Sequence, residues 1–164
     1  MKIIGIAAVA ENGIIGKNGK LPWYLPDDLR HFKEKTRGHW VVMGYMTYIH
    51  LGKPFPNRVN VIVTERPLED DRILQAASVE DALEMAFYEG AQKVFISGGA
   101  WTYKRAEPYI TEWELTIIHA DVEGDTSFPI DVNKLKMVSN QDCPVDDKHL
   151  YSYSFRVYKP ESID

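Results

Sequence analysis

An acidic residue, Asp28, lies on the apolar face of a predicted helix. The helix is predicted over residues 26–35 and starts with a proline, whose fixed backbone angle suits a first helical position. Asp28 shares one face, at helical spacing, with Leu25, Leu29 and Phe32. A carboxylate among apolar side chains loses hydration, so it must be neutralised, paired or hydrogen-bonded to a polar ligand. Asp28 is therefore a candidate for ligand binding or proton transfer, and the alternative is an ordinary first-turn acid that complements the helix dipole.

Strands alternate with helices along the rest of the chain. Apolar and β-branched runs predict buried strands at residues 3–9, 40–43, 59–64 and 93–97. Capping residues and helical spacing predict further helices at residues 44–51, 78–89 and 100–106. Two later segments alternate apolar and polar residues and indicate a closing antiparallel pair, at residues 112–119 and 150–158.

No internal repeat or linker divides these 164 residues, a length that suits one domain with a sizeable core. We therefore expect a single α/β domain over residues 1–164. Its central sheet should be mixed and mostly parallel, with helices on both faces and antiparallel strands at the C-terminal end.

Charge and composition exclude several classes of protein. The chain has 19 Lys and Arg against 24 Asp and Glu, and its net charge of −5 argues against nonspecific binding to nucleic acid or to an anionic membrane. No apolar run approaches the roughly 18 residues of a membrane span. The single cysteine, Cys143, excludes an internal disulfide and suits a reducing compartment, so we expect a cytoplasmic protein. We also expect a monomer. The five histidines lack metal-ligand spacing, and no metal is expected.

Residues 10–24 are predicted to form a loop that covers a ligand. This segment shows neither helical nor strand periodicity, because it is interrupted by Gly13, Gly16, Gly19 and Pro22. Loops of this length are usually functional or disordered. Apolar residues within it, Ile14, Ile15, Leu21 and Trp23, argue against simple disorder. A packed surface loop is the alternative.

Several short motifs occur together in an order and at a spacing that one protein family shares. They are Ile6-Ala7-Ala8, Gly13-Ile14-Ile15-Gly16, Leu21-Pro22-Trp23, Leu25-Pro26-Asp27-Asp28-Leu29, Phe32-Lys33, Met43-Gly44, Pro56-Asn57-Arg58, Ser97-Gly98-Gly99, Tyr103 and Val122-Glu123-Gly124-Asp125-Thr126. Each motif alone is weak, but together they cover essentially the whole chain. On these motifs the chain resembles the dihydrofolate reductase family.

The resemblance implies an NADPH-dependent oxidoreductase. The family transfers a hydride to C6 of 7,8-dihydrofolate and a proton to N5, which gives 5,6,7,8-tetrahydrofolate for one-carbon metabolism. Asp28 matches the family's pterin-binding acid, Thr116 matches the side chain that partners it, and Trp23 is grouped with them as a catalytic residue. An ordered water is expected to deliver the proton, because the carboxylate is too far from N5 for direct transfer.

The resemblance also implies which residues contact the substrate. Arg58 matches the arginine that pairs with the α-carboxylate of the glutamate tail, a pairing that suits a planar guanidinium. The other implied substrate contacts are Ile6, Ala7, Leu29, Phe32, Lys33, Leu51, Lys53, Phe55, Ser97 and Tyr103.

A larger set of residues is implied for the nicotinamide cofactor. Gly98 and Gly99 lie between a predicted strand and a predicted helix, where free amide groups suit a pyrophosphate, and the family joins these glycines by a cis peptide. The implied cofactor contacts are Ala8, Ile15, Gly16, Asn18, Gly19, Lys20, Leu21, Gly44, Tyr45, Met46, Thr47, Val63, Thr64, Glu65, Arg66, Gly98, Gly99, Ala100, Trp101, Thr102, Tyr103 and Thr126.

Two positions depart from the family pattern near the cofactor. Tyr45 stands where the family usually has Arg or Lys, and Glu65 stands where a basic or small hydroxyl residue is common. A carboxylate repels a 2′-phosphate but accepts a hydrogen bond from a plain 2′-hydroxyl, which favours NADH. Because Arg66 is close enough to compensate, we expect NADPH, with NADH as the alternative.

Two other functions remain open at this point. One is the pyrimidine reductase of riboflavin synthesis, which also uses a nicotinamide cofactor but would not need Arg58 for a glutamate tail. The other is a noncatalytic module that binds folate or a nucleotide. Consumption of NADPH in the presence of dihydrofolate separates both from a dihydrofolate reductase.

Overall fold

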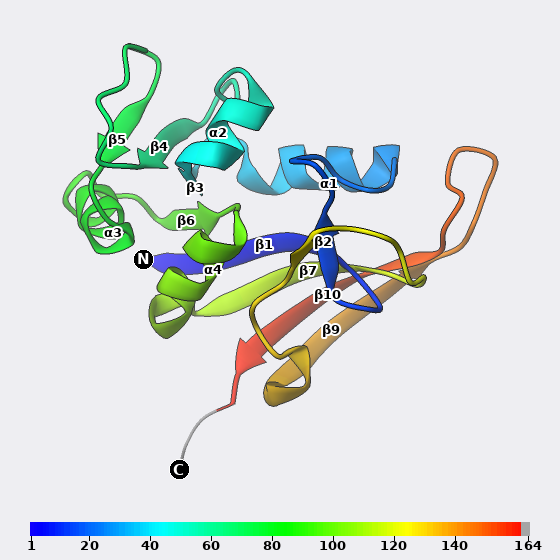
Figure 1. The fold of residues 1–164 in the computed structure, drawn as a ribbon. Helices are drawn as coiled ribbons and strands as arrows, with labels where there is room; N and C mark the ends of the chain where they lie inside the picture. The colour runs from blue at the N-terminus through cyan, green and yellow to red at the C-terminus, as the bar shows by residue number, and fades with distance from the viewer. Residues whose placement is uncertain (162–164) are drawn as a thin grey trace.

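Strand β1, which spans Lys2–Ala10, lies inside the central sheet because it is apolar on both faces. Ile4 and Ile6 pack into one cluster of buried side chains, and Val9 packs into a second cluster. A strand covered on both faces is expected to be almost continuously apolar. The computed structural model describes residues 1–161 (Figure 1), so residues 162–164 of the predicted domain lie outside it.

Within residues 1–161, one eight-stranded sheet has the order β5-β4-β3-β6-β1-β7-β10-β9. Besides β1, its strands are β3 (Trp40–Gly44), β4 (Val59–Val63), β5 (Leu74–Ala76), β6 (Lys93–Ile96), β7 (Glu112–Ile118), β9 (Leu135–Cys143) and β10 (Tyr153–Pro160). The pairings from β5 to β7 are parallel, whereas β10 is antiparallel to β7 and β9. This confirms the predicted mixed sheet with antiparallel closing strands.

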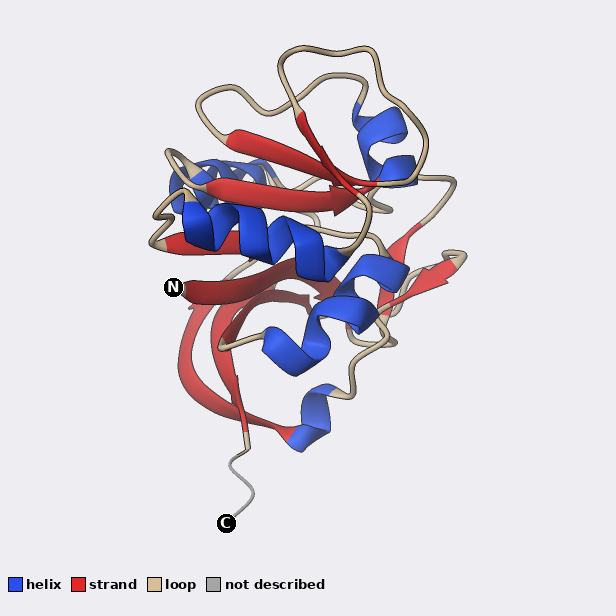
Figure 2. Cartoon of the chain, turned by 90° about the vertical axis from the view of Figure 1, so that its left-hand side faces the viewer, coloured by secondary structure: helices blue, strands red, loops and turns tan. Residues whose placement is uncertain are grey.

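Helices cover both faces of the sheet, as predicted (Figures 1 and 2). Helices α1 (Pro26–Thr36) and α2 (Tyr45–Leu51) contribute Phe32 and Leu51 to the cluster around Ile6. Helices α3 (Val79–Tyr88) and α4 (Ala100–Ala106) pack on the other face, in the cluster around Val9. Short 3-10 helices follow at Glu107–Tyr109 and Val132–Lys134. In the part of the chain described, no helix is long and apolar enough to cross a membrane.

Several strands were not predicted from the sequence. Within the predicted loop of residues 10–24, β2 (Ile14–Gly16) pairs with β8 (Thr126–Ser127) in a separate two-stranded sheet. The edge strands β5 and β9 were also missed, because most of their side chains are exposed and leave no apolar pattern. The predicted strand over residues 150–158 is wrong at its start, since β10 begins only at Tyr153.

Candidate functional site

The side chain of Asp28 points from α1 into the protein. Asp28 is 8 % exposed, and its Oδ1 accepts a hydrogen bond of 2.7 Å from the Thr116 hydroxyl on β7. The predicted helix and the predicted pairing of these two residues are therefore present. The prediction that Leu29 belongs to the buried apolar face of this helix is wrong, because Leu29 is 41 % exposed. Because consecutive helical residues are about 100° apart, a face that buries Asp28 leaves Leu29 at its border.

Burial changes the proton affinity of this carboxyl group. Loss of hydration raises the pKa of Asp28 above its ordinary value of 3.8, and the hydrogen bond from Thr116 lowers it by less. The carboxyl group therefore holds a proton at a higher pH than an exposed aspartate does. That is the property of a group that exchanges protons or binds a polar ligand inside a protein.

Trp23 lies near this helix in the small cluster that also contains Leu25. Its ring is buried, at 7 % exposure, and its Nε1–H is the one buried side-chain donor without a hydrogen-bond partner in residues 1–161. Buried donors are normally paired, so an unpaired one marks a place where a ligand or a water molecule binds. The grouping of Trp23 with Asp28 as a catalytic pair stays a prediction.

Four of the predicted substrate residues form one apolar surface. Ile6 of β1 lies in the same cluster as Phe32 of α1, Leu51 of α2 and Phe55 of the following loop. The rings of Phe32 and Phe55 are 5.0 Å apart and tilted by 55°. This surface can receive the apolar parts of an aromatic ligand.

Arg58 is held beside this surface by the end of α1. Its Nε donates to Thr36 Oγ1 at 3.0 Å, and one of its terminal nitrogens donates to the Lys33 carbonyl at 2.7 Å. Its guanidinium lies 5.8 Å from the centre of the Phe55 ring. These contacts fix a positive charge at the edge of the apolar surface, where a carboxylate could pair with it.

Two supporting residues escaped the sequence analysis. Asn60 of β4 is buried and hydrogen-bonds both to the amide and to the carbonyl of Phe55, at 3.0 and 2.9 Å. Thr36 is also buried and supplies the oxygen that accepts from Arg58. An asparagine inside the apolar run of β4 was the available signal, because a buried amide must find partners.

The predicted cofactor glycines meet where parallel strands end. The amide of Gly44, at the end of β3, donates to the carbonyl of Gly98 at 2.9 Å, and Gly98 and Gly99 are joined by a cis peptide. A Cβ at Gly44 would lie 2.8 Å from Thr102 Oγ1, so only glycine fits there without movement. Thr47 lies against Gly98 and Gly99. In open α/β sheets, ligands bind beyond the carboxyl ends of the strands, which is where these residues lie.

Strand β1 connects the glycines to the buried acid. The Tyr103 hydroxyl, which lies against Gly98, donates to the Ile6 carbonyl at 2.7 Å. Ala8, two residues further along β1, is the register partner of Thr116 on β7. Two residues of strand cover about 7 Å, which is a span that a ligand crossing both groups can bridge.

Near the end of β4, Arg66 stacks on Tyr45. The guanidinium lies 5.0 Å from the centre of the tyrosine ring, and the Arg66 amide donates to Thr64 Oγ1 at 3.1 Å. Tyr45 thus carries the guanidinium of Arg66 on its ring. Glu65, which lies between Thr64 and Arg66, is exposed.

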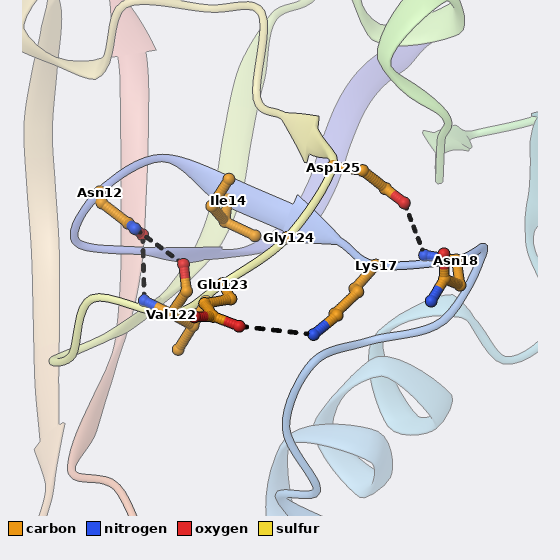
Figure 3. A pocket seen from close by; sticks show the side chains of 8 residues that line it. All are labelled: Asn12, Ile14, Lys17, Asn18, Val122, Glu123, Gly124 and Asp125. Carbon is orange, nitrogen blue, oxygen red and sulfur yellow. Dashed lines mark hydrogen bonds and ion pairs between the residues drawn. The ribbon is translucent and has the colours of Figure 1, made fainter.

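The segment from β2 to α1 is held by the β7–β8 connection (Figure 3). Asp125 accepts from the Asn18 amide at 2.8 Å and donates its own amide to the Gly16 carbonyl at 3.0 Å. A hollow of about 580 Å³ lies between residues 12–18 and the β7–β8 connection, lined by Asn12, Ile14, Lys17, Asn18, Val122, Glu123, Gly124 and Asp125. Neither Asp28 nor the glycine pair lines this hollow.

The other predicted contacts are scattered around these groups. Val63 is buried, and the partly buried ones are Ala7, Ile15, Ser97, Ala100 and Thr126. The exposed ones are Gly19, Lys20, Leu21, Lys33, Met46, Lys53 and Trp101. A second hollow, of about 820 Å³ between α3 and the starts of β3, β4 and β5, contains none of the predicted residues.

Comparisons with known proteins agree with this arrangement. A family model described as dihydrofolate reductase matches residues 2–160. The dihydrofolate reductase of Bacillus subtilis is 38 % identical over 159 residues, which cover 96 % of this chain and 94 % of that protein. The type 3 dihydrofolate reductase of Salmonella typhimurium is 40 % identical over 157 residues, with 94 % and 96 % covered.

A solved structure extends the likeness to three dimensions. The dihydrofolate reductase from Enterococcus faecalis, complexed with NADP(H) and RAB-propyl, superimposes with a TM-score of 0.88. It is 36 % identical, and the match covers 98 % of this chain and 97 % of the other. The chain belongs to the dihydrofolate reductase family.

The raised pKa of Asp28 predicts how its replacement changes stability. Below pH 3.8 both the folded and the unfolded chain hold the proton. As the pH rises from there, the unfolded chain releases its proton first, so the folded state loses stability until the pH passes the raised pKa of Asp28. Asp28→Asn, which keeps the acceptor for Thr116, should therefore be more stable than the unmodified chain at pH 7, as measured by urea unfolding.

A matched variant tests the sign of this effect. Thr116→Val removes the hydrogen bond that lowers the pKa of Asp28, and should extend the loss of stability to higher pH. Parallel stability curves for the unmodified chain and Asp28→Asn between pH 4 and pH 8 would contradict the burial argument.

Proposed function

We propose that the chain reduces 7,8-dihydrofolate to 5,6,7,8-tetrahydrofolate with NADPH. Membership of the dihydrofolate reductase family supports this activity, and the buried pair of Asp28 and Thr116 is the observation that carries it. Bound NADPH supplies the hydride, so the residues of the chain have to bind, orient and protonate the pterin. The Enterococcus faecalis relative was solved with NADP(H), which supports the same cofactor here.

Asp28 would bind the amino-pyrimidine edge of the pterin. A carboxylate oxygen that does not bond Thr116 is free to accept from N3 and from the 2-amino group. The unpaired Nε1–H of Trp23 would hold an ordered water near the pterin, and that water would pass a proton to N5. Burial raises the pKa of Asp28, which keeps a proton available to this site closer to neutral pH.

The remaining groups would hold the two ends of the ligands. The apolar surface of Ile6, Phe32, Leu51 and Phe55 would contact the pterin and the p-aminobenzoyl ring. Arg58 would pair with the α-carboxylate of the glutamate tail. The residues around the glycine pair fit a pyrophosphate, because Gly44 and Gly98 leave no side chain between the strand ends. Arg66, resting on Tyr45, would meet the 2′-phosphate.

We also infer that the chain acts as a cytoplasmic monomer without nucleic-acid or membrane partners. Its net charge of −5 supports the absence of nucleic-acid and membrane partners, and its single cysteine supports the cytoplasm.

The activity itself is tested by the fall in absorbance at 340 nm when the protein, NADPH and dihydrofolate are mixed. Asp28→Asn should lower the rate of hydride transfer by about 10²- to 10⁴-fold near neutral pH, because it removes the group that supports protonation. Glu34→Gln is the matched control, since Glu34 is an exposed acid on the same helix, and this variant should keep the unmodified turnover. Equal turnover of Asp28→Asn and the unmodified chain at every pH would remove Asp28 from the chemistry.

Arg58→Leu should weaken the binding of dihydrofolate. We expect a loss of about 2 kcal/mol, or roughly a 30-fold rise in KM, because Arg58 is only partly buried. The variant should use a dihydropterin that lacks the glutamate tail as well as the unmodified chain does. An equal loss with both substrates would show that Arg58 stabilises the loop and does not bind the tail.

Arg66→Ala should reduce the preference for NADPH over NADH. Loss of one charge-assisted hydrogen bond to phosphate is expected to lower the ratio of the two kcat/KM values by about tenfold. Arg72→Ala is the control, because Arg72 lies on the same connection but pairs with Asp70 at 2.9 Å. A ratio that is unchanged in Arg66→Ala, or lowered equally in Arg72→Ala, would exclude a specific role for Arg66.

A further inference from the structure

Helix α1, which carries Asp28, starts without a cap from its own sequence. Its N-cap residue is Leu25, whose side chain cannot accept a hydrogen bond, and its first helical residue is a proline without an N–H. The amide groups of Asp28 and Leu29 donate to the Leu25 carbonyl, at 3.0 and 3.2 Å. The amide of Asp27 is therefore the N–H of this first turn that still needs an acceptor.

His149 provides that acceptor from 122 positions away in the sequence. The Asp27 amide donates to His149 Nε2 at 3.2 Å. His149 lies in the connection between β9 and β10, and only 1 % of it is exposed. The long-range bond thus completes the first turn of α1 and ties it to the end of the β9–β10 hairpin.

The proton on His149 is placed by a second contact. Nδ1 lies 2.7 Å from Oδ1 of Asp146, and this hydrogen bond is the main reason that the pKa of Asp146 is lowered. Asp146 is therefore a carboxylate that can only accept, so Nδ1 carries the proton and the lone pair of Nε2 faces Asp27. The ring also packs against Tyr153, with centroids 5.3 Å apart.

A further carboxylate, that of Asp27, lies close to His149. Asp27 Oδ2 lies 3.9 Å from Nε2, and the charge of Asp27 is in turn paired with Arg30. The turn is closed by backbone hydrogen bonds in both directions between Asp146 and His149, at 3.2 and 3.3 Å. The imidazole is therefore held from both sides.

We propose that His149 is a positioning residue for Asp28. The bond to Asp27 fixes the backbone one residue before the acid, and so sets the direction in which Asp28 reaches Thr116 and the substrate. Misplacement of a reacting group by about 1 Å costs on the order of 100-fold in rate. The inference rests on the proposed role of Asp28 and adds a residue from the far end of the chain to it.

The test compares two replacements of His149. His149→Phe keeps a ring against Tyr153 but removes both hydrogen bonds, and should lower the single-turnover rate of hydride transfer by about 10- to 100-fold, with a smaller change in KM. His149→Gln keeps an acceptor for Asp27 and a donor for Asp146, and should stay within about threefold of the unmodified rate. The apparent pKa of the rate against pH should move in His149→Phe and not in His149→Gln.

A third variant covers the case in which His149→Phe does not fold. Asp146→Ala changes an exposed residue and removes the group that orients the imidazole, and should give a folded protein with a smaller loss of rate and a shifted pH profile. A lower melting temperature with an unchanged rate and pH profile, in His149→Phe or in Asp146→Ala, would overturn the proposal and leave His149 a purely structural residue.

The same assays separate this inference from the proposed function. If the unmodified chain does not reduce dihydrofolate, the proposed function fails and the positioning role fails with it. If the unmodified chain is active, Asp28→Asn is impaired and His149→Phe is normal, then only the inference about His149 fails.

Discussion

The candidate site depends on keeping one carboxyl group away from water. Within residues 1–161 the side chain of Asp28 has a single hydrogen bond, from Thr116, and its burial raises its pKa. An apolar residue at this position would pack without that cost, so the acid weakens the fold in order to hold a proton and a polar ligand. Buried positions of a helix are normally apolar, and functional sites commonly depart from such patterns. Here the departure is the single residue Asp28 in helix α1.

Strand β1 lets the sheet bring distant groups to this acid. It lies between β6 and β7 and runs parallel to both, so the glycine pair after β6 and Thr116 in β7 flank its carboxyl-terminal half. The Tyr103 hydroxyl bonds the backbone of the same strand on the side of the glycines. A rigid strand covered on both faces thus sets the spacing between the two halves of the site, which is more accurate than a spacing set by loops.

Polar contacts hold the loops that complete the site. Asn60 holds the backbone at Phe55, Thr36 holds the guanidinium of Arg58, and Asp125 holds the segment after β2. Each contact joins a loop to a strand, a helix or a second loop distant in sequence. Segments that would otherwise sample many conformations are in this way fixed near the ligands, which reduces the entropy lost on binding.

The sequence by itself determined helix α1 with Asp28 on its buried face, the parallel strands, the glycine pair and the family. Each of these follows from the spacing of neighbouring residues or from a short motif, and none requires knowledge of a contact with a distant part of the chain. Only the tertiary structure decided the contacts between distant residues and the exposed elements. The pairing of β2 with β8, the exposed strand β9, the stacking of Arg66 on Tyr45 and the bond from His149 to Asp27 all join residues that are far apart in the chain or leave no apolar period. Local patterns report which face of an element is buried, whereas a contact between two polar groups depends on where the whole sheet brings them.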